Sequence, residues 1–224
     1  TYRPLSEWYW ERTLAFGPPD EMETPFPKRV AETSGAIALS PNGKRIVWEN
    51  DAIDADEVYR RRLMSSDGES SPFSLDAPAW EPTLSDQRCV YVKPDEAGVY
   101  QLFLHDFESK TKRQLTQGND DSLEPCLTAD GRAVVFTSYA TNLLSGENGR
   151  FSDIYLLDLE SSELQLLTLG GDGNSYNPTI SGDGSTVAFA SLATNLGEEL
   201  VEPGQVYVWQ KSWKRCRSAG SSQD

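Results

Sequence analysis

Two stretches of the chain match almost position for position, namely PCLTADGRAVVFTS at residues 125–138 and PTISGDGSTVAFAS at residues 178–191. Shorter copies in the same register are IALSPNGKRIVW at residues 37–48 and PTLSDQRCVYV at residues 82–92. The residues that mark the register are Ser40, Ser85, Thr128 and Ser181. Because self-similarity at a period of roughly 45 residues marks a structural repeat, the chain contains four copies of one unit.

Each unit has the pattern of several short antiparallel strands. Asn-Gly or Asp-Gly at residues 42–43, 130–131 and 183–184 is typical of a hairpin turn, since glycine accepts a positive φ. The strand that follows is rich in β-branched and aromatic residues. It places Trp48, Val92, Phe136 and Phe189 at one equivalent position. Third strands are predicted at residues 58–59, 102–103, 154–155 and 206–207, and fourth strands at residues 112–116 and 164–168. Four such strands in roughly 45 residues are typical of a β-propeller blade.

Two further motifs make the pattern more specific. DIYLLDL follows at residues 153–159, and S-x-A-T-N-L occurs at residues 138–143 and 191–196. Together with P-x-[IL]-[ST]-x-D-G and V-x-F, these motifs resemble the TolB-type (PD40-like) β-propeller repeat over about residues 30–215. The resemblance implies an all-β propeller of four-stranded antiparallel blades. Its relatives include periplasmic interaction proteins, substrate-gating domains of peptidases and a few lyases, so the repeat specifies a fold and not a chemistry.

The expected domain organisation follows the repeat. We predict propeller repeats over residues 30–217 and a C-terminal tail at residues 218–224. The four blades are expected at residues 30–75, 76–119, 120–173 and 174–217. Residues 1–29 are expected to supply N-terminal strands that help to close the ring; a partial fifth blade, or a ring completed by another chain, is the alternative. Trp8 and Trp10 either pack against Trp209 and Trp213 at that closure or form an apolar contact patch.

Composition excludes several classes of partner. The net charge of −15 argues against nucleic acid or an anionic membrane as the main partner. No apolar run approaches the roughly 18 residues of a membrane-spanning helix. Three cysteines without C-x-x-C spacing indicate neither a zinc site nor a disulfide framework.

One end of the propeller is predicted to be acidic. The loops between blades and the loops between second and third strands share one end, which we call the top face. They hold many acidic residues but only Lys93 and Arg150 among the basic ones. Three interpretations stay open at this stage. The face keeps the protein soluble, docks a partner protein through its basic surface, or binds a divalent cation such as Ca²⁺.

A candidate binding site lies within the top face, at the mouth of the central channel. It combines aromatic rings with acids or amides at the starts of the innermost strands, which suits a pocket that stacks an apolar group and hydrogen-bonds a polar one. Alternatively, the rings pack between blades and the polar groups satisfy strand ends. The predicted site residues are Trp80, Glu81, Asp120, Asp121, Glu124, Tyr176 and Asn177.

Catalytic signatures are largely missing from the sequence. His105 is the only histidine and is predicted to be a structural imidazole, and neither G-x-S-x-G nor a phosphate-binding glycine loop occurs. We therefore predict a non-enzymatic interaction scaffold outside the cytoplasm, in a periplasm or organelle lumen, without a cofactor, catalytic residue or metal site. The alternative is a carbohydrate- or peptide-acting enzyme that uses top-face carboxylates, with Glu81 and Glu124 as acid and base.

Overall fold

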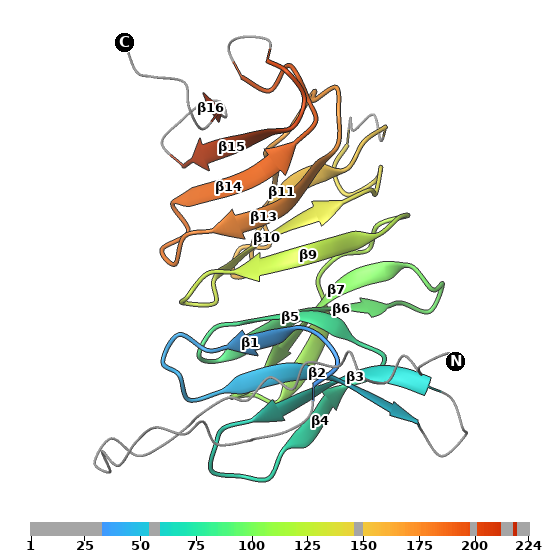
Figure 1. Ribbon diagram of the computed structural model, residues 1–224, viewed down its shortest axis with the longest axis vertical. Coiled ribbons are helices and arrows are strands. Elements are labelled where there is room, and N and C mark those ends of the chain that lie inside the picture. Colours follow the sequence, from blue (N-terminus) through green and yellow to red (C-terminus); the bar gives the residue numbers. More distant parts are fainter. Residues whose placement is uncertain (1–32, 54–58, 146–149, 198–200, 212–216, 219–224) are drawn as a thin grey trace, which may run out of the picture.

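The computed structural model describes residues 33–53, 59–145, 150–197, 201–211 and 217–218. Every regular element in these residues is a β-strand, and the strands form four antiparallel sheets of four strands each. The sheets follow one another along the chain, so each is one repeat, as predicted, and we number them blades 1 to 4. Blades 1 and 4 lie at opposite ends of the long axis of the molecule (Figure 1).

The strands of each blade are hydrogen-bonded in chain order. Blade 1 contains β1 (Ile37–Leu39), β2 (Ile46–Ile53), β3 (Tyr59–Ser66) and β4 (Phe73–Asp76). Blade 2 contains β5 (Trp80–Leu84), β6 (Arg88–Pro94), β7 (Tyr100–Asp106) and β8 (Thr111–Gln114). Blade 3 contains β9 (Ser122–Leu127), β10 (Ala133–Ser138), β11 (Asp153–Asp158) and β12 (Leu164–Leu166). Blade 4 contains β13 (Ser175–Ile180), β14 (Thr186–Ser191), β15 (Gln205–Gln210) and β16 (Arg217–Ser218).

The turn between the first two strands explains why the repeat is so regular. In blades 1, 3 and 4 its glycine has φ between 70° and 71°, which favours glycine. The Ser or Thr that marks the register donates a hydrogen bond to the turn Asn or Asp, for example from Thr128 Oγ1 to Asp130 Oδ1 at 2.7 Å. These turns, with Leu39 at the end of β1, define the bottom face, which comprises residues 39–45, 85–87, 128–132 and 181–185.

The turn of blade 2 corrects one predicted equivalence. Leu84 pairs with Cys89 there, whereas Leu127 pairs with Val134 in blade 3, so the turn is two residues shorter. Consequently Tyr91, and not Val92, is the equivalent of Phe136 and Phe189. Sequence alignment placed Val92 there because it allowed for only one missing residue in this turn. The ring of Tyr91 stacks on that of Phe103 at 6.3 Å, as Phe136 stacks on Tyr155 and Phe189 on Tyr207.

The hydrophobic core lies between neighbouring blades. One cluster joins Val90 and Leu102 of blade 2 to Val134 and Phe136 of blade 3, and similar clusters join blades 1 and 2 and blades 3 and 4. Burial at these contacts is the main source of stability. At blade 4 the pattern changes, since Val206 is 52% exposed. It occupies the position of Ile154, which is fully buried between blades 3 and 4.

Several predictions fall on residues that the structure does not describe. These include ring closure by residues 1–29 with Trp8 and Trp10, the packing of Trp213, and the tail from residue 219 onward. Some of the acids assigned to the top face also lie outside the described residues, namely Asp54, Asp56, Glu57, Glu147, Glu198 and Glu199. Their roles stay predictions.

Candidate functional site

The loops assigned to the top face do lie at one end of the blades. Side-chain hydrogen bonds join the loops that precede blades 3 and 4 to the long loops of those blades. Asn119 Nδ2 donates to Thr141 Oγ1 at 2.8 Å, and the Asn119 backbone N–H donates to Asn142 Oδ1 at 2.8 Å. In the next blade, the backbone N–H and hydroxyl of Thr194 donate to the Asp172 carboxylate at 2.6 and 2.7 Å. The Thr-Asn pair of each S-x-A-T-N-L motif therefore fixes the shape of the top face.

A chain of hydrogen bonds connects the innermost strands below this face. Glu49 Oε1 accepts from the backbone N–H of Glu81 at 2.9 Å, and Glu81 Oε2 accepts from that of Glu124 at 2.8 Å. Glu124 Oε2 in turn accepts from the backbone N–H of Asn177 at 2.7 Å and from the hydroxyl of Thr137 at 2.8 Å. We call Glu49, Glu81 and Glu124 the carboxylate ladder, because each one links its blade to the next.

The backbone explains why these N–H groups need a partner. Glu81, Glu124 and Asn177 have φ values of 51°, 55° and 52° at the irregular point of β5, β9 and β13. At such a bulge the strand's own ladder leaves an N–H group unpaired. A left-handed conformation costs a non-glycine residue about 1–2 kcal/mol, and the carboxylate of the preceding blade offsets part of that cost.

Sequence analysis identified Glu81, Glu124 and Asn177 but missed Glu49. Ala36 stands at the equivalent position of blade 1, four residues before Ser40. The carboxylate for the first link comes instead from β2, where Glu49 is only 3% exposed and lies 3.3 Å from the guanidinium of Arg61. A glutamate directly after the apolar residues 46–48 was the one available signal.

Two of the remaining predicted site residues, Trp80 and Asp121, contact Tyr100 at the start of β7. Trp80 is half-buried and packs edge-on against Tyr100 with ring centroids 4.9 Å apart. Asp121 Oδ1 accepts a hydrogen bond from the Tyr100 backbone N–H at 2.9 Å. Tyr176 is half-buried and Asp120 is exposed. Glu81, Glu124 and Asn177 are thus linked in series, while Trp80 and Asp121 meet at Tyr100.

Electrostatics distinguish the ladder from the acids around it. Burial raises the pKa of Glu81, and the nearby Glu124 and Glu49 carboxylates raise it further, against the lowering effect of the Glu124 N–H. Burial also acts to raise the pKa of Asp76, but the Tyr91 hydroxyl at 2.6 Å and the Lys93 ammonium at 2.9 Å hold it below its usual value. Of these two carboxylates, that of Glu81 therefore carries the less favourably placed charge.

Other chemistry-bearing groups do not converge on the ladder. His105 lies in β7 with its ring edge-on to Phe107 at 4.8 Å, and burial lowers its pKa. Cys89 is fully buried, and burial raises its pKa. Among the described residues, no group of three or more His, Cys, Asp or Glu side chains is arranged to hold a metal ion.

The top face also carries most of the exposed apolar surface of the described residues. Eight large apolar side chains are exposed in this part of the chain, and five of them lie in top-face loops or at strand ends that meet them. These five are Ile53, Tyr100, Tyr139, Leu169 and Leu192. Exposed acids among them are Glu96, Asp120, Asp172 and Glu202.

Comparison with solved structures identifies the architecture. TolB from Acinetobacter baumannii matches 86% of this chain with a TM-score of 0.59 and 18% identity, and a putative TolB from Agrobacterium tumefaciens matches 88% with a TM-score of 0.62 and 17% identity. The chain has a TolB-like β-propeller fold. The tricorn protease also matches, with a TM-score of 0.59 and 15% identity over 86% of this chain.

The chain spans only part of these proteins. It covers 45% of the Acinetobacter TolB, 70% of the Agrobacterium protein and 23% of the tricorn protease. No protein-family model and no curated protein sequence matches the chain. At identities this low the likeness establishes the fold, which hosts both TolB and a protease.

Proposed function

We propose that this TolB-like propeller is a non-enzymatic scaffold whose top face docks a partner protein with a basic surface. The observation that carries the proposal is the grouping of Ile53, Tyr100, Tyr139, Leu169 and Leu192 with exposed acids at one end of the blades. Exposed apolar side chains rimmed by polar ones mark interaction sites, and acids steer a basic partner during encounter.

The carboxylate ladder favours binding over catalysis. A general acid or base must reach a substrate proton, whereas Glu81 and Glu124 each accept a main-chain N–H of the following blade. These two side chains therefore support the channel mouth at which the partner docks. The extracytoplasmic location belongs to the same proposal and rests on the likeness to TolB.

A peptide- or carbohydrate-acting enzyme is the second candidate, and one observation favours it. The pKa of Glu81 is raised by burial and by Glu124, which is a property of many general acids. Turnover of peptide or glycan substrates by the purified chain, lost in Glu81→Gln, would establish the enzyme.

No helix in the described residues has the length and hydrophobicity to cross a membrane.

The test is a capture experiment with matched variants. The immobilised chain is incubated with extract of its native compartment, and bound proteins are quantified by mass spectrometry at about 50 and 500 mM salt, where the Debye length falls severalfold. The double variant Asp120→Asn/Leu169→Ser removes one exposed acid and one exposed apolar side chain from the top face. Leu39→Ser is the control, because Leu39 is 54% exposed on the opposite end.

The proposal expects one basic protein to bind the wild type and Leu39→Ser at low salt. High salt and the double variant should each reduce its recovery at least tenfold. Equal recovery by both variants at either salt concentration would show that the top face only keeps the protein soluble.

A further inference from the structure

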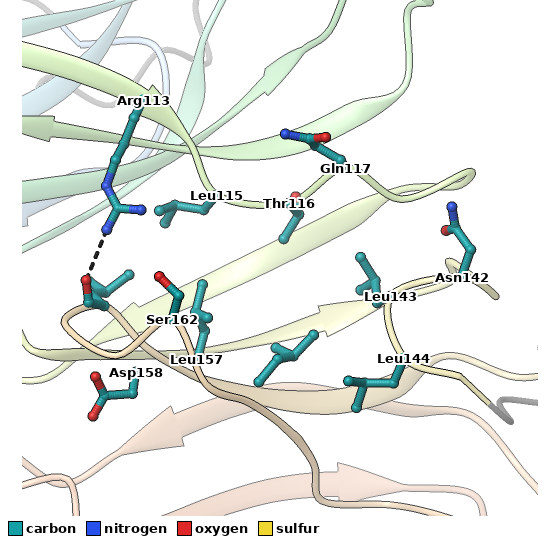
Figure 2. Close-up of a pocket in the computed structure, with 12 residues that line it drawn as sticks. Arg113, Leu115, Thr116, Gln117, Asn142, Leu143, Leu144, Leu157, Asp158 and Ser162 are labelled. Carbon is teal, nitrogen blue, oxygen red and sulfur yellow. Dashed lines mark hydrogen bonds between the residues drawn. The ribbon is translucent and has the colours of Figure 1, made fainter.

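A cavity of about 460 Å³ lies between blades 2 and 3, at their outer edge and away from the carboxylate ladder (Figure 2). It opens between Leu115, just after β8, and the outermost strand of blade 3, β12. Half of the residues that line it are leucines, namely Leu115, Leu143, Leu144, Leu157, Leu159 and Leu164. A volume of this size with several apolar side chains is within the range of small-molecule sites.

The neighbouring junctions show what is missing from this one. Leu157 pairs with Val134 across β10 and β11. At the equivalent position of blade 2 His105 pairs with Cys89, and in blade 4 Trp209 pairs with Val187. Both rings are buried. The junctions between blades 1 and 2 and between blades 3 and 4 therefore contain a ring where the junction between blades 2 and 3 has a leucine.

Residues near Leu157 between blades 2 and 3 also have equivalents near Trp209 between blades 3 and 4. Trp209 belongs to one buried cluster with Leu167 and Leu196. Leu115 is the equivalent of Leu167, since their N–H groups bond to the carbonyls of Leu102 and Ile154, which share one position. Leu143 is the equivalent of Leu196 in the S-x-A-T-N-L motif. Leu115 and Leu143 are thus the equivalents of two leucines that share a buried cluster with an indole in the next junction.

Polar residues make up the other half of the cavity lining. An Nη atom of Arg113 donates to the Leu159 carbonyl at 3.0 Å, which closes one end (Figure 2). Gln117 and Asn142 lie toward the other end, where the side chains are exposed. The Asp158 carboxylate, which also lines the cavity, accepts the backbone N–H groups of Glu160 and Ser161 at 2.9 and 2.8 Å. Because both charged groups already have partners within the protein, the leucine walls favour a neutral ligand.

We propose that this cavity binds a small, neutral aromatic molecule, with its ring against Leu157 in the place that the Trp209 indole takes between blades 3 and 4. The ligand is a free molecule of about indole size. The proposal does not rest on the docking role of the top face, because none of the five exposed apolar side chains that carry that role lines the cavity.

The test uses indole as the probe and ¹H–¹⁵N NMR of the whole chain as the readout. In the wild type, indole should shift the amide signals of Leu115, Leu143 and Leu159 with a dissociation constant at or below about 1 mM. Leu157→Trp places an indole in the cavity from within the chain. It should weaken indole binding at least tenfold while leaving the melting temperature equal or higher, because it fills a void.

Two controls keep the experiment decisive. Leu157→Phe carries a smaller ring and serves if the tryptophan variant does not fold; it too should weaken indole binding. N-acetyltryptophanamide represents a side chain of a partner protein and should bind more weakly than indole. The proposal is overturned if indole leaves the cavity amides unshifted, if binding persists in the folded Leu157 variants, or if the amide derivative binds more tightly.

Discussion

The two faces of the propeller hold their loops in different ways. On the bottom face each turn is short and is closed by its own residues, as in the bond from Ser181 Oγ to Asp183 Oδ1 at 2.6 Å. Neighbouring turns then interlock, as in the bond from the Ala129 N–H to the Gly182 carbonyl at 3.1 Å. On the top face the loops are long and depend on one another, through Asn119, Asp172 and the carboxylate ladder. The repeat is accordingly most regular at the bottom and varies at the top, where rigid blades present loops that can carry binding.

The largest expected loss of stability comes from a substitution on the bottom face, at Gly131. A Cβ atom on Gly131 would lie 2.5 Å from the Ser85 Oγ atom of the neighbouring blade, at a φ of 71°. Strain and overpacking together should lower the free energy of unfolding of Gly131→Ala by about 3 kcal/mol. Gly43→Ala has the same backbone strain but open space around it, so it should lose only about 1 kcal/mol. Equal losses in urea denaturation would contradict an interlocked bottom face.

A smaller loss is expected from the ladder beneath the top face. Glu124→Ala leaves the Asn177 N–H and the Thr137 hydroxyl without their acceptor, which should cost about 2 kcal/mol. Glu124→Gln keeps an acceptor oxygen and should lose less than half as much. Urea denaturation of both variants measures the difference, and a glutamine variant as unstable as the alanine variant would show that charge, rather than capping, matters.

The pH dependence of the ladder sharpens the comparison further. The pKa of Glu81 is higher in the folded chain than in the unfolded one, so the folded state binds the extra proton between those two values. Its ionisation therefore destabilises the fold as pH rises above the usual glutamate range. The stability of Glu81→Gln relative to wild type should increase between pH 4.5 and 7, by less than about 1 kcal/mol. A difference that is constant across this range in denaturant titrations would contradict the assignment.

The smallest stability effects are expected at the exposed apolar side chains of both faces. Leu169→Ser on the top face and Leu39→Ser on the bottom face should each change the free energy of unfolding by no more than about 0.5 kcal/mol. Thermal melts of the two variants check this. A large loss in either would show that the side chain supports the fold, and its exposure would then carry no information about binding.

The fold was predictable because the repeat combines turn chemistry with strand pattern in every unit. Ser181, Asp183 and Gly184 specify a turn by themselves, and the strand after it alternates between two buried faces. What failed was the equivalence of Val92, because the turn before Cys89 lacks two residues where the alignment allowed for one, and the register is therefore shifted by one position. Local patterns do not reveal such a shift until strand pairing is known.

The candidate site was less predictable, because its links run between blades. Glu81 and Glu124 stand out by position, but their hydrogen bonds to residues 43 and 53 positions away follow only from packing. Glu49 takes part from a different strand, so the repeat gives no hint of it. The cavity, in contrast, has a trace in the sequence, since Leu157 aligns with His105 and Trp209.

The most direct measurement of the docking role is site-specific photo-crosslinking in the native compartment. A photoreactive phenylalanine derivative replaces Leu169 on the top face, which is 74% exposed, or Leu39 on the bottom face. Our account predicts a crosslink to one basic protein from position 169, lost on adding Asp120→Asn or salt, and no such product from position 39. The same product from both positions, or from position 39 alone, would contradict it.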